Sequence, residues 1–397
     1  MLNAYGGASY YANASKNNIF ITNSSISNNV LGSYSYDANA SKNNIFITDT
    51  SINVDAYGSY SVEGNSLNNN LFIINSSIGN DIYGGYSYYA NASKNNVFVT
   101  NSSISDDVFG SNALNNSEYN NVFITDSTIS MDIIGGYSNE GNASNNNIFI
   151  TGNSISNYIA GGYTSQNGNV SYNTVNISGN AKVVDVDGGS SNNGSAYNNT
   201  VNINGDAEVT GGVYGSYSEN SNAYDNTVNI SGGIVTGNVH GGYSSSGSAN
   251  DNIVNISGGT IGADGSIDVY GGYSEMGSAN NNVINIGGSA DIENANLYGS
   301  NSSNNSVNTL TIDAWNGSTQ SVKNFSDINF NNVNWKNGGI VLTITGGQEG
   351  NLDNTNINLN SIAGGSSIKA GDKMTFISSN TNLSDEVNYN INDTFTA

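Results

Sequence analysis

The most constraining feature of this 397-residue chain is a glycine-centred motif that returns about every 26 residues. A second motif, Asn-Asn-Ile-Phe-Ile-Thr at 17–22, recurs in the same phase at 43–48 and, with drift, at 199–204. A fixed repeat of this length predicts a solenoid, in which each repeat packs on its neighbours. The first glycine of the motif lies at Gly6, Gly32, Gly58, Gly84, Gly110, Gly135, Gly161, Gly188, Gly215, Gly241, Gly271 and Gly299.

Each repeat contains a short strand rather than a helix. Residues 19–22, Ile-Phe-Ile-Thr, are β-branched or aromatic and are bounded by Asn and Ser, which is typical of a strand between turns. Gly, Asn and β-branched residues all disfavour a helix. The central position of this strand changes along the chain while the flanking positions stay mostly apolar. It reads Phe20, Phe46, Phe72, Phe98, Phe123 and Phe149, then Asn176, Asn202, Asn229, Asn255 and Asn285.

Neighbouring residues on a strand face opposite sides, so we expect the apolar pair inside and the Phe or Asn position outside. A second strand should precede the glycines, with Val30, Ile82, Val108, Ile133, Ile159, Val213, Val239, Val269 and Leu297 inward. Beside them we expect outward Leu31, Tyr57, Tyr83, Phe109, Ile134, Asp187, Tyr214, His240, Tyr270 and Tyr298. A third apolar line comprises Ile26, Ile52, Ile78, Ile104, Ile129 and Ile155.

Two or three strands in each repeat predict an all-β fold, a parallel β-helix of about 11 coils in residues 1–301. We expect right-handed coils, the usual hand of parallel connections. Coils stacked at the inter-strand spacing make a rod on the order of 50 Å long. Side chains at equivalent positions then form ladders, with Asn side chains hydrogen-bonded along the axis and aromatic rings stacked. Residues 302–397 lose the period, and we expect an irregular β continuation or cap there.

Composition excludes several classes of function. The net charge is −23, with eight basic residues in all, so nucleic acid is not an expected partner. No apolar run approaches the length of a membrane span, and we expect no direct insertion of this chain into a membrane. The chain has no Cys and one His, which removes Cys and His metal centres. We therefore expect no cofactor and no metal.

Catalysis is not the favoured function. The acidic clusters that are candidates for such chemistry are Asp106 with Asp107, Asp185 with Asp187, and Asp264 with Asp268. A glycosidase needs two carboxylates across a cleft, but we expect Asp187 to be a solvated surface acid. His240 takes the position of Tyr214 and Tyr270 in its repeat, so we expect a substituted surface aromatic residue rather than a catalytic one. We interpret the chain as a non-enzyme.

The repeats resemble the passenger regions of bacterial autotransporters. The resemblance lies in Asn-Thr-Val-Asn-Ile-Ser-Gly at 173–179 and 226–232, in the Gly-Gly-Tyr-Ser returns, and in residues 315–318, 333–339 and 368–372. The resemblance implies a passenger displayed on the cell surface and anchored in the outer membrane through a C-terminal barrel. Since residues 1–20 have no signal-peptide pattern and no barrel-like strands follow within the sequence, we expect a passenger fragment.

Two aromatic series are the candidate contact residues. One is the Phe series from Phe20 to Phe149 given above, and the alternative for these rings is a role in stability alone. Exposed aromatic surface that is contiguous marks contact sites. Adhesion to surface glycans or proteins of a host or of bacteria, or self-association, is therefore the expected function. The alternatives are a secreted β-helical polysaccharide-degrading enzyme and a purely structural spacer rod. The second series is Tyr34, Tyr60, Tyr86, Tyr137, Tyr163, Tyr217, Tyr243 and Tyr273.

Overall fold

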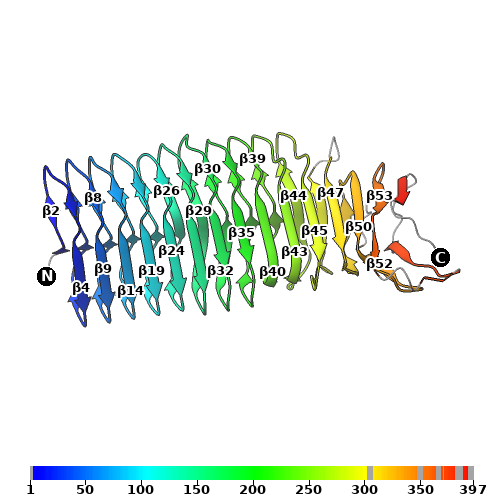
Figure 1. Cartoon of the computed structure of the whole chain (residues 1–397), viewed down its shortest axis with the longest axis horizontal. Coiled ribbons are helices and arrows are strands. Elements are labelled where there is room, and N and C mark those ends of the chain that lie inside the picture. The colour runs from blue at the N-terminus through cyan, green and yellow to red at the C-terminus, as the bar shows by residue number, and fades with distance from the viewer. Residues whose placement is uncertain are drawn as a thin grey trace.

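The computed structural model describes residues 3–301, 307–346, 352–363, 368–369, 371–380 and 388–391. These residues form a rod of parallel strands stacked as a β-helix, with the two ends of the chain at opposite ends of the rod (Figure 1). The predicted fold is confirmed, with about 13 turns of about 26 residues each. The described residues include no helix that is long and apolar enough to cross a membrane.

The longest file of strands carries the Phe and Asn positions, and each strand pairs in parallel with the next coil (Figure 1). Its members lie in register, so Phe20 pairs with Phe46 and Asn176 with Asn202. The file comprises β4 (Asn18–Thr22), β9 (Asn44–Thr48), β14 (Asn70–Ile74), β19 (Asn96–Thr100), β24 (Asn121–Thr125), β28 (Asn147–Thr151), β31 (Thr174–Ile177), β35 (Thr200–Ile203), β40 (Thr227–Val235), β43 (Ile253–Ile261), β45 (Val283–Gly287), β47 (Thr309–Asp313), β50 (Asp327–Asn331), β53 (Asn356–Leu359) and β56 (Asn388–Ile391).

Two further files follow in each coil. The first is β5 (Ser25–Ile26), β10 (Ser51–Ile52), β15 (Ser77–Ile78), β20 (Ser103–Ile104), β25 (Thr128–Ile129), β29 (Ile155–Thr164), β32 (Lys182–Asp187) and β36 (Glu208–Val209). The next, which we call the inner file, is β1 (Ala4–Tyr5), β6 (Val30–Leu31), β11 (Ala56–Tyr57), β16 (Ile82–Tyr83), β21 (Val108–Phe109), β26 (Ile133–Ser138), parts of β29 and β32, β37 (Val213–Tyr214), β41 (Val239–His240), β44 (Ile267–Ser274), β46 (Ala295–Ser300) and β49 (Ser321–Lys323).

The coil is closed by a tyrosine file after the glycines and by an alanine-rich sheet. The tyrosine file is β2 (Ala8–Ser9), β7 (Tyr34–Ser35), β12 (Tyr60–Ser61), β17 (Tyr86–Ser87), β22 (Asn112–Ala113), parts of β26, β29 and β44, β33 (Ser190–Ser191), β38 (Tyr217–Ser218) and β42 (Tyr243–Ser244). The alanine-rich sheet is β3 (Ala14–Ser15), β8 (Ala40–Ser41), β13 (Ser66–Leu67), β18 (Ala92–Ser93), β23 (Ser117–Glu118), β27 (Ala143–Ser144), β30 (Val170–Ser171), β34 (Ala196–Tyr197) and β39 (Ala223–Tyr224).

The apolar core lies inside the coils, as predicted. The residues flanking the Phe position, for example Ile45 and Ile47, are fully buried, and so are Val30 and the other predicted inward residues of the inner file. Ile155 differs from the other members of the third apolar line, because it is 47% exposed. An extra residue at Gly152, which has a positive φ, shifts the register, so Ile155 pairs with Thr128 and Ser156 takes the inward place.

A file of asparagines that were not predicted to be interior supports one corner of each coil from Asn17 to Asn308, and all but the first are fully buried. Asn146 illustrates the pattern: its backbone N–H and its amide group both donate to Oδ1 of Asn173, at 2.9 and 3.0 Å, and the amide also donates to the Ser117 carbonyl. Because the hydrogen bonds repeat from coil to coil, the buried polar atoms are paired. This buried Asn ladder comprises Asn17, Asn43, Asn69, Asn95, Asn120, Asn146, Asn173, Asn199, Asn226, Asn252, Asn282 and Asn308.

The described part of residues 302–397 continues the rod in less regular coils. Strands β47, β50, β53 and β56 extend the longest file in parallel pairs. Beside them lie a three-stranded sheet, β48 (Gly317–Thr319), β52 (Ile340–Ile344) and β55 (Thr375–Ser379), and the pair β51 (Val333–Asn334) and β54 (Ile362–Ala363). Trp315 joins the core and donates from Nε1 to the Ala290 carbonyl at 2.9 Å. The predicted boundary at 301/302 adjoins residues 302–306, which lie outside the described residues, as does residue 370 of the motif at 368–372.

Candidate functional site

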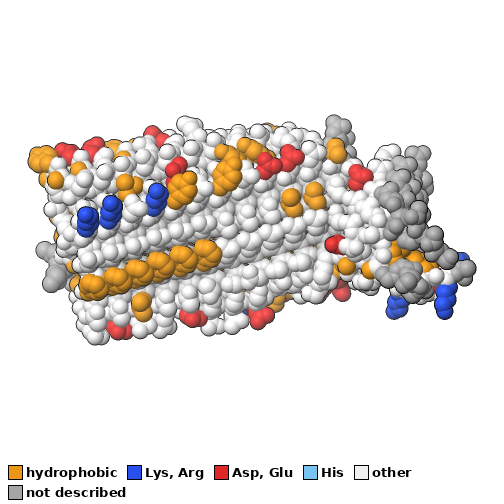
Figure 2. Space-filling model, viewed as in Figure 1, with side chains coloured by type: hydrophobic (Ala, Val, Ile, Leu, Met, Phe, Trp, Pro, Cys, Tyr) orange, Lys and Arg blue, Asp and Glu red, His pale blue; other side chains and the backbone are white. Residues whose placement is uncertain are grey.

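The Phe series forms a single stripe on the outer face of the longest file. Consecutive rings are nearly parallel, with centroids 4.6 to 5.0 Å apart. Figure 2 shows the stripe as a continuous hydrophobic row over the N-terminal half of the visible face. The rings cover one another's faces, so Phe20 at the end of the row is 72% exposed while the middle rings are half-buried. The predicted outward orientation and stacking are confirmed.

The stripe stops where Asn replaces Phe. Asn202 donates from its amide to Oδ1 of Asn176 at 2.8 Å, and the same bond links Asn229, Asn255 and Asn285 in turn. This outer Asn ladder was predicted from the sequence, and it shows that the same strand position accepts either an apolar or a polar ladder. A neighbouring ladder from Asn18 to Asn147 uses the same amide bond along the first coils.

The predicted tyrosine series is less exposed than expected and is not continuous. All eight side chains are partly buried. Their stacked rings fall into three groups, 34–60–86, 137–163 and 217–243–273. The groups are separated by Asn112 and Ser190, which occupy the tyrosine position in their coils. Burial raises the pKa of Tyr86 to about 12, so its hydroxyl stays protonated at neutral pH.

Alternate residues of the inner file, such as Tyr57 and His240, were predicted to face outward as surface residues, and the structure corrects this prediction. Their side chains point away from the core but are covered wholly or in part by the tyrosine series, because the glycine corner turns one ladder against the other. Tyr57, for example, meets Tyr60 and Tyr86 edge-to-face, at interplanar angles of 75° and 89°. Such perpendicular contacts are favourable for aromatic rings. Phe109, Ile134 and Ala160 consequently form a second, smaller apolar cluster.

His240 belongs to this covered ladder and is not a surface residue. It is 5% exposed and is stacked between Tyr214 and Tyr270, with ring centroids at 4.8 and 5.2 Å. Its Nδ1 is buried without a hydrogen-bond partner in the described residues. Burial lowers the pKa of His240 to about 3, which keeps the imidazole neutral. The predicted aromatic substitution is therefore right and the predicted exposure is wrong.

Asp187 is likewise buried rather than solvated, and it is 6% exposed. It accepts a hydrogen bond of 2.7 Å from the Tyr158 hydroxyl, and burial raises its pKa to about 7. Its neighbour Asp185 accepts a bond of 2.6 Å from the Gly212 N–H. Asp268 accepts bonds from Tyr270 and Asn296, at 3.3 and 2.9 Å. These carboxylates are thus engaged in bonds that hold the coils together.

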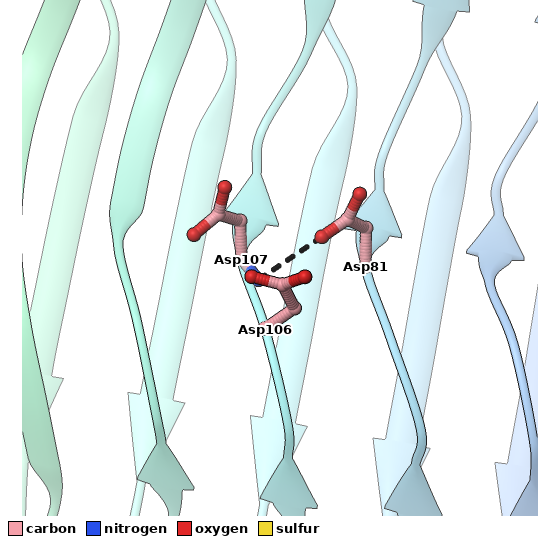
Figure 3. A group of neighbouring side chains, drawn as sticks. All are labelled: Asp81, Asp106 and Asp107. Carbon is pink, nitrogen blue, oxygen red and sulfur yellow. Dashed lines mark hydrogen bonds between the residues drawn. The ribbon is translucent and has the colours of Figure 1, made fainter.

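The closest group of acids lies at a corner near the middle of the N-terminal half. Carboxylate oxygens of Asp81, Asp106 and Asp107 lie within 4.8 Å of one another (Figure 3). Oδ1 of Asp81 accepts the Asp107 backbone N–H at 3.1 Å, and Oδ1 of Asp107 accepts that of Asp132 at 2.9 Å. The corner is therefore an acidic ladder with a structural use. Calcium takes six to eight oxygen ligands, and no ligand set of that size is assembled by these three side chains.

Stacked carboxylates make the stability of the rod depend on pH. Burial, opposed in part by hydrogen bonding, raises the pKa of Asp107 to about 6, above its ordinary value of 3.8. The folded state therefore holds the proton more tightly than the unfolded state, so its relative stability falls as pH rises from about 4 through 6. We expect Asp107→Asn to raise the free energy of unfolding at pH 7.5 by about 1 kcal/mol, a value discounted for solvent screening.

The measurement is urea unfolding at pH 5 and pH 7.5. Asn is suitable because Asn29 takes the same place in its own coil and accepts the Asp55 N–H. We expect the gain of the variant to shrink at pH 5, where Asp107 is largely protonated. An equal gain at both pH values would contradict the electrostatic explanation. Asp37, which is exposed in an N-terminal turn, supplies a control substitution to Asn.

Comparison with protein-family models, curated proteins and solved structures returned no match.

Proposed function

We propose that this protein is a non-catalytic contact rod, displayed on the cell surface as an autotransporter passenger and acting in adhesion or self-association. The observation that carries the proposal is the stripe of six stacked phenylalanines on an outer face of the rod (Figure 2). The core is closed beneath it by Ile and Val, so these rings are not needed to fill the interior. A contiguous apolar surface kept in water is typical of a contact site.

The charge around the stripe supports contact with a partner. Lys16, Lys42 and Lys94 are exposed in the turns just before strands of the longest file, and Figure 2 shows three basic side chains in a row parallel to the stripe. The one ion pair in the described residues is elsewhere, between Lys182 and Glu208 at 2.6 Å. A chain of net charge −23 thus carries a locally basic, apolar face. Such a face suits a partner surface with apolar and negative groups.

The geometry of a rod supports a mechanism based on repetition. Phe recurs at the same strand position in six successive coils, and each ring offers a contact that is weak alone. Several contacts made together increase the overall affinity without any new type of interaction. The engagement of Asp185, Asp187 and Asp268 in hydrogen bonds between coils supports the non-catalytic reading.

The Phe stripe can be removed with little risk to the fold, because later coils of the same chain carry Asn at the same strand position. We expect a variant with Asn at Phe46, Phe72, Phe98 and Phe123 to fold, since Asn occupies this position from Asn176 to Asn285 in a hydrogen-bonded ladder. Cells displaying this variant should lose at least about tenfold in binding or aggregation, the effect expected when several weak contacts are lost together. Flow cytometry of labelled-cell binding and the settling rate of a cell suspension measure this.

The reciprocal variant, Phe at Asn176, Asn202 and Asn229, lengthens the apolar face and should strengthen the same contacts. Surface display and circular dichroism of each variant establish that it is presented and folded. Unchanged binding and settling in the Asn variant would refute the contact role of the stripe and favour the spacer. The half-buried tyrosines are a less direct test, because removing them also disturbs the covered ladder.

A further inference from the structure

The tyrosine series is interrupted at Asn112, and the structure has a cavity at that place. Asn112 pairs with Tyr86 on one side and with Tyr137 on the other, so it occupies the position of a tyrosine. The cavity has a volume of about 400 Å³ and is lined by Tyr86, Tyr137, Asn112, Tyr88, Tyr89 and Leu114, among others. Its size lies in the range of small-molecule sites.

The walls of the cavity are two aromatic faces separated by one missing ring. In intact parts of the series, neighbouring rings stack at 4.8 Å for Tyr60 on Tyr86 and at 5.4 Å for Tyr137 on Tyr163. Tyr86 and Tyr137 are two coils apart, or roughly 10 Å at the spacing of parallel strands. The space between Tyr86 and Tyr137 therefore fits one phenol ring, which would stack on a tyrosine on each side.

The covered ladder beneath the cavity also lacks contacts. Tyr57 touches two outer rings edge-to-face, Tyr60 and Tyr86. Within the described residues, Tyr83 has one such contact, with Tyr86, and Phe109 has one, with Tyr137. Each ring lacks the partner that a tyrosine at 112 would provide. An aromatic ring in the cavity would restore both edge contacts in addition to the two stacked contacts.

The side-chain amide of Asn112 is a polar group at the site that a ligand could contact. The Asn112 side-chain amide makes no hydrogen bond in the described part of the chain, and it lies between the two walls. Tyr88 and Tyr89 lie at the rim, are 48% and 49% exposed, and pack edge-to-face on each other at 4.6 Å. The other interruption, at Ser190, differs because the partly buried Tyr158 side chain reaches it and forms hydrogen bonds with the Ser190 hydroxyl and with Asp187.

We propose that the cavity at Asn112 is a binding site for one planar aromatic ring of phenol size, held between Tyr86 and Tyr137 with its edge toward the Asn112 amide. The ring can belong to an aromatic side chain of a partner protein or to a free small molecule. The site lies within the tyrosine series, the second set of candidate contact residues, and so rests on the proposed contact function and extends it. It does not depend on the Phe stripe.

The test uses p-cresol, the side chain of tyrosine, as the probe on the whole chain. Saturation-transfer NMR and a chemical-shift titration should give a dissociation constant on the order of 1 mM, typical of a ligand with so few atoms. N-acetyl-tyrosine-amide at the same concentrations establishes whether a ring carried on a peptide backbone enters as well. Methyl β-glucopyranoside is the comparison, because sugars stack on tyrosine faces without being planar.

The decisive variant is Asn112→Tyr, which completes the series with the residue that the neighbouring coils use. We expect it to weaken p-cresol binding at least tenfold and to raise the melting temperature, while Asn112→Ala keeps the cavity open and retains binding within threefold. If Asn112→Tyr does not fold, Tyr137→Ala, which removes one wall, should lose binding while Asn112→Ala keeps it. Equal binding of p-cresol to the filled and open variants, or binding of the sugar alone, would overturn the proposal.

These outcomes are independent of the cell-contact assays. If the rod binds p-cresol but the Phe→Asn variant loses no adhesion, the proposed site stands and the contact role of the stripe is refuted. If the stripe mediates adhesion but the rod does not bind p-cresol, only the proposed site is refuted.

Discussion

Asn146→Leu is expected to destabilise the rod by roughly 4 kcal/mol, because it removes a fully buried amide that is hydrogen-bonded to three neighbouring residues. Asn146 accepts bonds from the backbone N–H and the amide of Asn120, at 3.0 and 2.8 Å. It also donates to Asn173 and to the Ser117 carbonyl. Leu has almost the same shape, so little volume is lost. The cost arises from buried donors and acceptors left without partners, which is measured by urea unfolding followed by circular dichroism.

The adjacent residue supplies a matched control. Asn147 has the same side chain but is half-buried on the outer face, where its amide donates to Asn121 at 2.9 Å. We expect Asn147→Leu to cost less than about 1 kcal/mol, because water can replace the lost partner. If the two variants lose similar amounts of unfolding free energy, the buried Asn ladder stabilises the corner no more than a single exposed amide hydrogen bond does.

Gly161→Ala is the second change with a large expected effect, a loss of about 3 to 5 kcal/mol of unfolding free energy. A Cβ atom at this glycine would lie well inside contact distance of the Gly188 carbonyl oxygen and 2.9 Å from Cβ of Asn173. Both obstacles belong to the next coil and one is backbone, so neither can move without changing the coil spacing. The reason for glycine here is close approach of the coils rather than a positive φ, which the structure does not show at Gly161.

Gly287→Ala is the control, since the nearest atom to its added Cβ is the Asp313 carbonyl oxygen at 3.2 Å. We expect this variant to unfold within about 1 kcal/mol of the parent chain. Thermal melting followed by circular dichroism compares the two variants. A Gly161→Ala rod as stable as the Gly287→Ala rod would mean that the coils can separate at this corner without loss.

Both variants change motifs that are visible in the sequence, but the structural role of one motif was easier to infer from the sequence than that of the other. The glycine series indicated the period and the corners, and the alternation of Ile, Phe and Ile indicated which side of the strand is buried. The buried Asn ladder, by contrast, lies one residue before the ladder from Asn18 to Asn147, and the two look alike in a sequence rich in Asn. Only the left-handed residue before it, such as Asn145 with φ of 57°, turns the next side chain inward.

The sequence by itself determined the solenoid, the strand of the Phe series and its outward face, and the outer Asn ladder, because these depend on a period and on alternation within one strand. Tertiary structure alone decided the burial of His240 and Asp187, the division of the tyrosine series into three groups and the cavity at Asn112. The physical reason is that the side chains of the inner file that point away from the core are covered, across the glycine corner, by side chains of the same coil and of the next coil. Whether a residue that points away from the core meets water or another ring is set by that corner.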